Sequence, residues 1–285
     1  MDTRPIGVFD SGMGGLTAVR QMIRMLPGED IVYFGDTGRV PYGGRSVETI
    51  VRYARQDVAF LRSFDLKAIV IACGTVSTTA LDVIIDENHI PILGVVEPAA
   101  RAAAEATRNG RVGIVGTKAT IRTGAYEASI RKLLPEVYLT AKACPLLVPL
   151  VEEGRFQRGD IVTERVVEEY LSPVKAQGVD TLVLGCTHYP LLREIISDYM
   201  GSDVTLIDTG EQAARAIAAL LAERDQLNDR TRNGERRYYA SDSAEDFAAT
   251  ASLYLGSNIA GSVERIDIEL YLNKAWHSTK ARPVE

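Results

Sequence analysis

The amino-acid sequence predicts an α/β protein of two similar lobes, each a mainly parallel sheet flanked by helices. Short apolar runs alternate with helical patterns along the chain, and this alternation is typical of parallel sheets covered by helices. Two of the runs, 68–72 and 181–185, lead directly into a cysteine with a threonine close behind it. The pattern that opens the chain also restarts near residue 98, as expected of two related domains.

Four apolar runs of strand length divide the first third of the chain, and helical spacing fills the segments between them. We predict strands over 6–10, 30–34, 67–72 and 91–96. We predict helices over 16–25 and 47–64, and a third that follows residue 73 to about residue 86. Because continuous apolar runs indicate strands buried on both faces, these strands should form one parallel sheet.

The rest of the chain begins with a strand over 111–116, which resembles the opening strand because it also runs into a glycine/threonine turn and a helix. Further strands are predicted over 181–184 and 204–208. The last predicted elements are a helix over 211–224, a polar loop over 225–236, a strand over 237–241 and a helix over 245–255.

These elements predict two lobes. We expect the first lobe to hold residues 1–97 and 208–285, and the second to hold residues 98–207. The segment after residue 224 is too short to form a domain of its own, so we assign it to the first lobe.

Composition argues against several classes of protein. A net charge of −6 does not favour a nucleic-acid surface. No apolar run approaches the roughly 18 residues that indicate a membrane span. The first residues, Met-Asp-Thr-Arg-Pro, lack the basic start and apolar core of a signal peptide, so we expect a cytoplasmic protein. Neither nucleic acid nor a membrane is therefore expected among its partners.

The three cysteines, Cys73, Cys144 and Cys186, are too few and too scattered for a disulfide framework. No CxxC pair or histidine-rich cluster is present in the sequence, so we expect no metal site. Cys144 has no polar partner close to it in the sequence, and we expect it to pack in the core.

Cys73 and Cys186 stand where open α/β sheets place their chemistry, at the carboxyl ends of strands. The helix that follows each cysteine favours a thiolate, and Thr75 and Thr187 can donate hydrogen bonds. Single free cysteines are more often small buried apolar residues. The matched placement of two thiols nevertheless favours a reaction that removes a proton from one face of a carbon and returns one to the other.

Asp10 ends the first predicted strand and Ser11 follows it, before a turn with three glycines over 12–15. Such a turn can bring backbone N–H groups close to an anion. The spacing is an incomplete form of the GxGxxG dinucleotide motif, with Asp36 about 20 residues further on. A dinucleotide site is the less favoured interpretation, because Asp10 would repel a pyrophosphate.

Three further segments carry polar groups that chemistry could use. The loop after the second predicted strand contains Asp36, Pro41, Tyr42 and Gly43, although its composition also fits an ordinary surface turn. His188 follows Cys186 by two residues; it could tune that thiol, and an unperturbed histidine titrates near neutrality. Glu152 and Glu153 could equally be a solvated helix end.

At these residues the chain resembles the glutamate racemases, cofactor-independent enzymes of the aspartate/glutamate racemase group. The matching blocks run in the family's order and span most of the chain. They lie at 7–16, 33–43, 72–75, 148–154 and 184–190.

The resemblance implies two pseudo-twofold-related lobes with the active site between them. It implies that Cys73 and Cys186 are the acid/base thiols, that Asp10 supports Cys73, and that His188 and Glu152 support Cys186. Asp10 and His188 are also expected to contact substrate. Further substrate contacts are expected from Ser11, Pro41, Tyr42, Gly43, Thr75, Thr187 and, with less weight, Thr117 and Thr120.

One position departs from the family pattern, because Gly74 stands where the family usually has asparagine after the first catalytic cysteine. The side-chain amide that would contact substrate is missing, and we expect a slightly wider choice of substrate. We still expect residue 74 to lie in the substrate site.

The resemblance implies glutamate as substrate, no cofactor, a homodimer, and a supply of D-glutamate for peptidoglycan synthesis. Two alternatives stay open at this point. One is a racemase of aspartate or hydantoins. The other is a two-lobed amino-acid binding protein without catalysis, which would not explain two thiols at strand ends.

Overall fold

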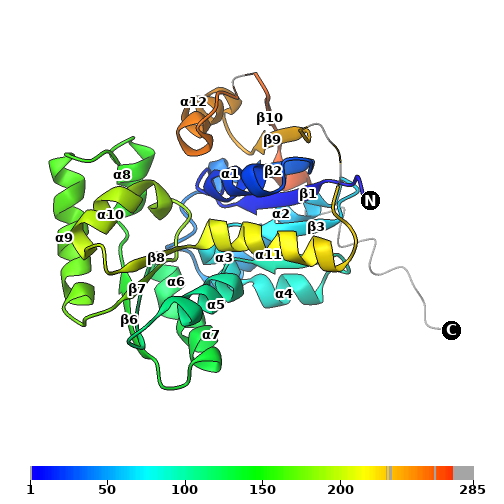
Figure 1. Ribbon diagram of the computed structural model, residues 1–285. Helices are drawn as coiled ribbons and strands as arrows, with labels where there is room; N and C mark the ends of the chain where they lie inside the picture. The colour runs from blue at the N-terminus through cyan, green and yellow to red at the C-terminus, as the bar shows by residue number, and fades with distance from the viewer. Residues whose placement is uncertain (1, 229, 231–232, 260, 272–285) are drawn as a thin grey trace.

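The computed structural model describes residues 2–228, 230, 233–259 and 261–271, and Figure 1 shows two groups of strands and helices side by side. The first sheet is entirely parallel, with the order β10-β9-β2-β1-β3-β4. Its strands are β1 (Ile6–Asp10), β2 (Ile31–Gly35), β3 (Ala68–Ile71), β4 (Ile92–Gly94), β9 (Arg236–Ala240) and β10 (Val263–Arg265).

The second sheet is also entirely parallel, with the order β6-β5-β7-β8. Its strands are β5 (Arg111–Gly116), β6 (Tyr138–Ala143), β7 (Thr181–Leu184) and β8 (Thr205–Asp208). This order repeats the order β2-β1-β3-β4 of the first sheet, with β6, β5, β7 and β8 in the places of β2, β1, β3 and β4. Strand β7 is thus the counterpart of β3. The predicted α/β fold of two similar parallel sheets flanked by helices is confirmed.

Helices cover both sheets, and α11 (yellow in Figure 1) leads back from the end of β8 across the first sheet. The helices around the first sheet are α1 (Leu16–Met25), α2 (Val47–Leu61), α3 (Gly74–Thr79), α4 (Leu81–Asp86), α11 (Thr209–Glu223) and α12 (Ala244–Leu255). Those around the second are α6 (Lys118–Thr123), α7 (Ala125–Leu133), α8 (Leu147–Glu152), α9 (Ile161–Lys175) and α10 (Arg193–Met200). Helix α5 (Val96–Ala106) joins the lobes and contacts both α7 and α11. Short 3-10 turns are η1 (Thr37–Arg39), η2 (Tyr189–Leu192) and η3 (Ile268–Tyr271).

The sequence explains why these segments form these elements. Every residue of β1, β2, β3 and β7 is buried, as continuous apolar runs in a parallel sheet require. At the N-termini of α2, α6, α9, α11 and α12, a short polar side chain accepts a hydrogen bond from a backbone N–H, a preferred way to satisfy these groups. These capping residues are Ser46, Thr117, Asp160, Asp208 and Ser243. No helix among the described residues is long and apolar enough to cross a membrane.

Several predicted boundaries are wrong. The strand predicted over 91–96 ends at Gly94, and α5 begins at Val96 with Pro98 in its first turn. A first-turn proline is tolerated because its missing N–H would have no partner within the helix. The point near residue 98, where the sequence predicts that the strand and helix pattern restarts, therefore lies inside α5. The helix predicted after residue 73 is two helices that meet at Ala80.

The segment after residue 224 extends the first sheet, because β9 pairs with β2 and β10 pairs with β9. At the other sheet, β8 ends on Asp208, whose side chain caps α11. The boundaries between the lobes, 1–97 plus 208–285 against 98–207, stay a proposal.

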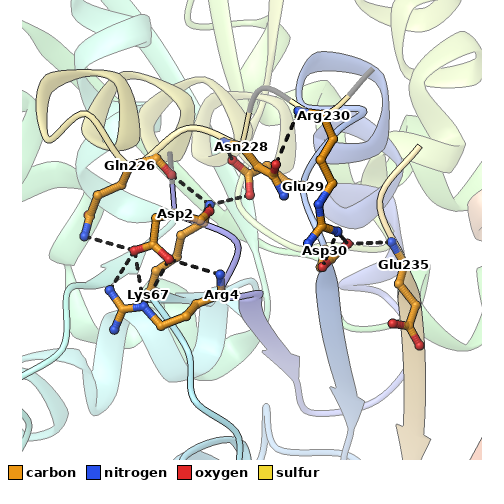
Figure 2. A network of polar contacts seen from close by, with 9 residues as sticks. All are labelled: Asp2, Arg4, Glu29, Asp30, Lys67, Gln226, Asn228, Arg230 and Glu235. Carbon is orange, nitrogen blue, oxygen red and sulfur yellow. Dashed lines mark hydrogen bonds and ion pairs between the residues drawn. The ribbon is translucent and has the colours of Figure 1, made fainter. Parts of the chain in front are cut away.

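A buried polar network holds the amino ends of the strands in the first sheet (Figure 2). Lys67 is wholly buried, and its Nζ lies 2.5 Å from Oε2 of Glu29. The same Nζ donates to the carbonyl oxygens of Asp2 and Gln226, so the ammonium group has two hydrogen bonds beside its ion pair. Arg230 and the backbone N–H of Glu235 bind Asp30 beside it. Gln226, Arg230 and Glu235, which lie between α11 and β9, are thereby bonded to residues at this end of the sheet.

Lys67→Met should destabilise the fold strongly, because it leaves the Glu29 carboxylate buried without its cation. Breaking a buried pair on one side costs about 3–5 kcal/mol. Arg55→Met is the matched control, since its bridge to Glu87 is exposed on both sides and should contribute under about 1 kcal/mol. Urea unfolding of both variants measures the difference. Equal losses of unfolding free energy would contradict this account of the network.

Candidate active site

The two predicted thiols occupy equivalent places in the two sheets. Cys73 follows β3 and stands directly before α3, and Cys186 follows β7, the counterpart of β3. Both are buried, with 4% and 6% of their surface exposed. The structure therefore carries one thiol at the carboxyl edge of each sheet.

The two carboxyl edges meet, because side chains of one lobe bind the other around the thiols. Thr187 Oγ1 donates to Oδ1 of Asp10 across 3.4 Å. Thr17 Oγ1 donates to the carbonyl oxygen of Thr187 at 3.0 Å. Thr75 Oγ1 lies 3.0 Å from Thr117 Oγ1, which in turn lies 3.0 Å from Thr120 Oγ1. Polar groups predicted from separate blocks of sequence thus converge between the lobes.

The glycine turn after β1 serves this close approach. A Cβ at Gly14 would stand 2.2 Å from Thr187 Oγ1 and 2.7 Å from the His188 ring. The Thr187–His188 segment therefore occupies the space beside the turn, and only glycine fits there. Because this close packing explains the glycine at position 14, that glycine no longer indicates a dinucleotide motif.

Cys73 lies beside Ser11 and Asp10. Its Sγ donates to Ser11 Oγ across 3.3 Å. Burial, together with the nearby Asp10 carboxyl, raises the pKa of the Cys73 thiol to about 12. Burial also raises the pKa of Asp10, although the backbone N–H of Gly12 donates to that carboxyl at 3.0 Å. At neutral pH Cys73 therefore carries its proton.

Cys186 has a different neighbour. Nδ1 of His188 lies 3.7 Å from its Sγ, and Nε2 lies 3.2 Å from Oε1 of Glu152. Burial alone would lower the pKa of His188, but the hydrogen bonds and negative charge of Cys186 and Glu152 outweigh it and raise this pKa to about 10. The expectation of titration near neutrality is thus corrected. His188 is a cation at pH 7 that can donate to Sγ of Cys186.

The Pro41–Gly43 turn reaches the second lobe through its backbone. The carbonyl oxygen of Gly43 accepts from the N–H of Ala119 at 3.1 Å. The Val40–Pro41 peptide is cis. The hydroxyl of Tyr42 contacts Asp36 and Asp57, so this side chain is held by a polar cluster within the first lobe.

Two tyrosines near the thiols escape prediction from the sequence. The ring of Tyr254, in α12, packs edge-on against His188 with centroids 5.8 Å apart. The ring of Tyr126, in α7, would lie 3.2 Å from a Cβ on Gly185, the residue before Cys186. Both hydroxyls are buried without a hydrogen-bond partner among the described residues. Neither tyrosine is near a cysteine in the sequence, so no local motif marks it.

Within the described part of the chain, no group of three or more His, Cys, Asp or Glu side chains could hold a metal ion. The titratable side chains gathered around the site include the two thiols, the carboxyls of Asp10 and Glu152, and His188.

A family model described as Asp/Glu/Hydantoin racemase matches residues 6–217. The chain belongs to this racemase family. Among curated relatives, the glutamate racemase of Streptococcus gordonii is 46% identical over 269 residues, which cover 94% of this chain and 100% of the relative. That of Geobacter metallireducens is 44% identical over 269 residues, covering 94% of this chain and 98% of the relative. The resemblance found in the sequence is confirmed.

Solved racemase structures share the fold. Glutamate racemase isoform RacE1 of Bacillus anthracis superposes with a TM-score of 0.88 at 38% identity, covering 94% of this chain and 98% of that one. The Francisella tularensis glutamate racemase, solved in complex with D-glutamate, gives 0.87 at 38% identity, covering 95% and 100%. This racemase therefore has the two-lobed architecture of those enzymes.

Gly74, the departure from the family pattern, packs directly against the other lobe. A Cβ at Gly74 would stand 2.3 Å from the backbone carbonyl oxygen of Gly185. Gly74→Ala should therefore hold the lobes apart and raise KM about tenfold, within the range of overpacking effects. Gly44→Ala is the control, since nothing lies within 4 Å of its Cβ position. Steady-state kinetics of both variants decides, and an unchanged KM for Gly74→Ala would contradict the close approach.

Proposed function

We propose that this racemase interconverts L- and D-glutamate with two thiols and without a cofactor. The observation that carries the proposal is the equivalent placement of Cys73 and Cys186 at the ends of β3 and β7. Relatives covering nearly the whole chain are named glutamate racemases, which supports glutamate as the substrate.

The chemistry needs a strong base and a dry site, because the α-proton of an amino acid is very weakly acidic. Both thiols are buried between the lobes. In the proposed complex, donors around the thiols bind the substrate carboxylates and stabilise the charge that develops beside Cα. These donors are the hydroxyls of Ser11, Thr75, Thr117, Thr120 and Thr187 and the backbone N–H groups of Gly43 and Gly74, while Pro41, which has no N–H, shapes the turn beside them.

A protonated Cys73 and a His188 cation beside Cys186 suit one direction of the reaction. By the family resemblance, Cys186 takes the proton from the L-isomer and Cys73 takes it from the D-isomer. In the L-to-D direction, the Cys186 thiolate accepts the α-proton beside the His188 cation. The protonated Cys73 then gives its proton to the opposite face of the carbanion. Protons balance, and before the next L-to-D turnover Cys186 gives its proton to solvent and Cys73 takes one from solvent, which restores the starting pair.

The neighbours of each thiol have separate roles in this scheme. Asp10, next to Cys73, disfavours a second negative charge there and so favours proton return to that thiol. Glu152 holds His188 by Nε2 and keeps it protonated beside Cys186. His188 thereby supports the thiolate that removes the proton of L-glutamate.

We also propose that the enzyme works as a homodimer in the cytoplasm and supplies D-glutamate for peptidoglycan synthesis. The named activity of its relatives supports this role. Light scattering on the purified protein tests the dimer by giving the mass in solution.

Purified protein, dialysed against a chelator, should convert L-glutamate until both enantiomers are equal, as followed by circular dichroism. L-aspartate is the comparison substrate and should react far more slowly. Activity that returns only after pyridoxal phosphate or a metal is added would contradict the cofactor-free scheme. Binding of glutamate without conversion would favour an amino-acid binding protein.

A further inference from the structure

A buried cluster of charged side chains lies beneath the turn that carries Pro41 and Gly43. We call Asp36, Arg39, Tyr42 and Asp57 the Arg39 cluster. Asp36 and Asp57 are wholly buried, and the Arg39 side chain is 11% exposed. Asp36 follows β2, Arg39 lies in η1, and Asp57 lies in α2. The mechanism above uses none of the three charged groups.

The Asp36 carboxylate has a full set of donors. Arg39 Nε donates to it at 2.6 Å and Ser241 Oγ at 2.7 Å. The hydroxyl of Tyr42 donates to the same oxygen as Arg39. Both oxygens of Asp36 are therefore bound by side-chain donors.

Asp57 lacks such a set. It accepts from Nη2 of Arg39 at 2.9 Å, and its other oxygen lies 3.3 Å from the hydroxyl of Tyr42. A hydroxyl has one proton, and that of Tyr42 goes to Asp36. The contact between Tyr42 and Asp57 is therefore a hydrogen bond only if the Asp57 carboxyl carries the proton.

The charges of the cluster lead to the same result. Asp36 and Asp57 share one guanidinium, which also meets Glu269 of η3 at 3.5 Å. Burial and the charge of Asp36 raise the pKa of Asp57 well above its usual range, and Asp10 adds to this while Arg39 opposes it. With a single cation inside the cluster, only one of the two buried carboxyls is compensated.

We propose that Asp57, in its protonated form, is a positioning residue that holds Tyr42 and with it the substrate-binding turn 41–43. Tyr42 lies between Pro41 and Gly43, and the carbonyl of Gly43 is bound by Ala119 of the second lobe. Fixing Tyr42 therefore fixes both the turn and its link across the site. The expected effect on glutamate binding rests on the proposed function, whereas the presence of a proton on Asp57 is independent of it.

The test compares Asp57→Asn with Asp57→Ala. An amide can accept from Arg39 and donate to Tyr42, as a protonated carboxyl does, so Asp57→Asn should keep the KM for glutamate within about twofold. Asp57→Ala should raise KM about tenfold, with a much smaller change in kcat. Glu269→Gln, which alters an exposed carboxyl on the same arginine, is the control and should match the wild type.

Two further measurements separate this role from a merely structural one. The KM of the wild type should rise as pH increases through the pKa of Asp57, and Asp57→Asn should lack that rise. Infrared difference spectra of wild type against Asp57→Asn at neutral pH should show the carbonyl band of a protonated carboxyl. This comparison does not use Asp57→Ala, so it tests the proposal even if that variant does not fold.

A missing carbonyl band, or an Asp57→Asn variant that binds glutamate as poorly as Asp57→Ala, would overturn the proposal. If the wild type does not racemise glutamate, the proposed function fails, yet the infrared band still decides whether Asp57 holds the proton.

Discussion

Cys73→Ala and Cys186→Ala are each expected to lower kcat for racemisation by at least about 10³-fold, with the fold retained. Each thiol serves one face of the α-carbon, and the thiols lie in different lobes, so neither can replace the other. Circular dichroism of the enantiomers at equal protein concentration measures the loss in both directions. Turnover near that of the wild type in either variant would rule out the two-thiol scheme.

Cys144→Ala is the matched control for this pair. Cys144 is the remaining cysteine and is wholly buried. Among the described residues, the one hydrogen-bond partner of its Sγ is the carbonyl oxygen of Lys142. Its removal should cost stability through a small cavity and leave kcat within a few fold. A large loss of activity there would mean that cavities, rather than missing acid/base groups, explain the other two variants.

Asp10→Asn and His188→Asn should impair opposite directions of the reaction. His188 supports the Cys186 thiolate, so its removal should lower kcat most for L-glutamate, by about 10²-fold. Asp10 lies on the Cys73 side, so its removal should bias the loss toward the reverse direction. Because the equilibrium constant stays near one, the asymmetry appears in kcat and not in the ratio of kcat/KM values.

The measurement is kcat in both directions for each variant, and equal losses everywhere would show that these neighbours are only structural. A pH series adds a check on His188. Its raised pKa means that the cation is present below about pH 10 and is lost above it, so its support for Cys186 should fade as pH rises through that value. The His188→Asn variant should lack this alkaline loss.

Local patterns in the sequence predict much of the fold and of the candidate site. Strands β1, β3 and β7 are largely continuous apolar runs. The polar groups at their ends, with Asp10 as the last residue of β1 and Cys73 and His188 after β3 and β7, stand in short motifs. Parallel sheets bring such ends to one edge, which is why separate motifs can be assigned to a single site.

Other features depend on tertiary packing and leave no local signal. Strand β6 is half exposed, and its sequence Tyr-Leu-Thr-Ala-Lys-Ala contains no apolar run. Strand β10 is only three residues long. Tyr126 and Tyr254 pack beside Gly185 and His188, next to Cys186, from helices far from either cysteine in the sequence. The pKa of His188 likewise follows from Glu152, which only the fold brings to it.

Racemisation of L-glutamate in deuterated water tests the central claim, that two separate thiols serve the two faces, most directly. Deuterium is measured at the α-carbon of both enantiomers early in the reaction. The two-thiol scheme predicts that the D-glutamate formed carries solvent deuterium from Cys73 while the remaining L-glutamate keeps its protium. Protium retained in the D-glutamate, or deuterium that enters both enantiomers equally from the start, would indicate one base acting on both faces and would contradict the scheme.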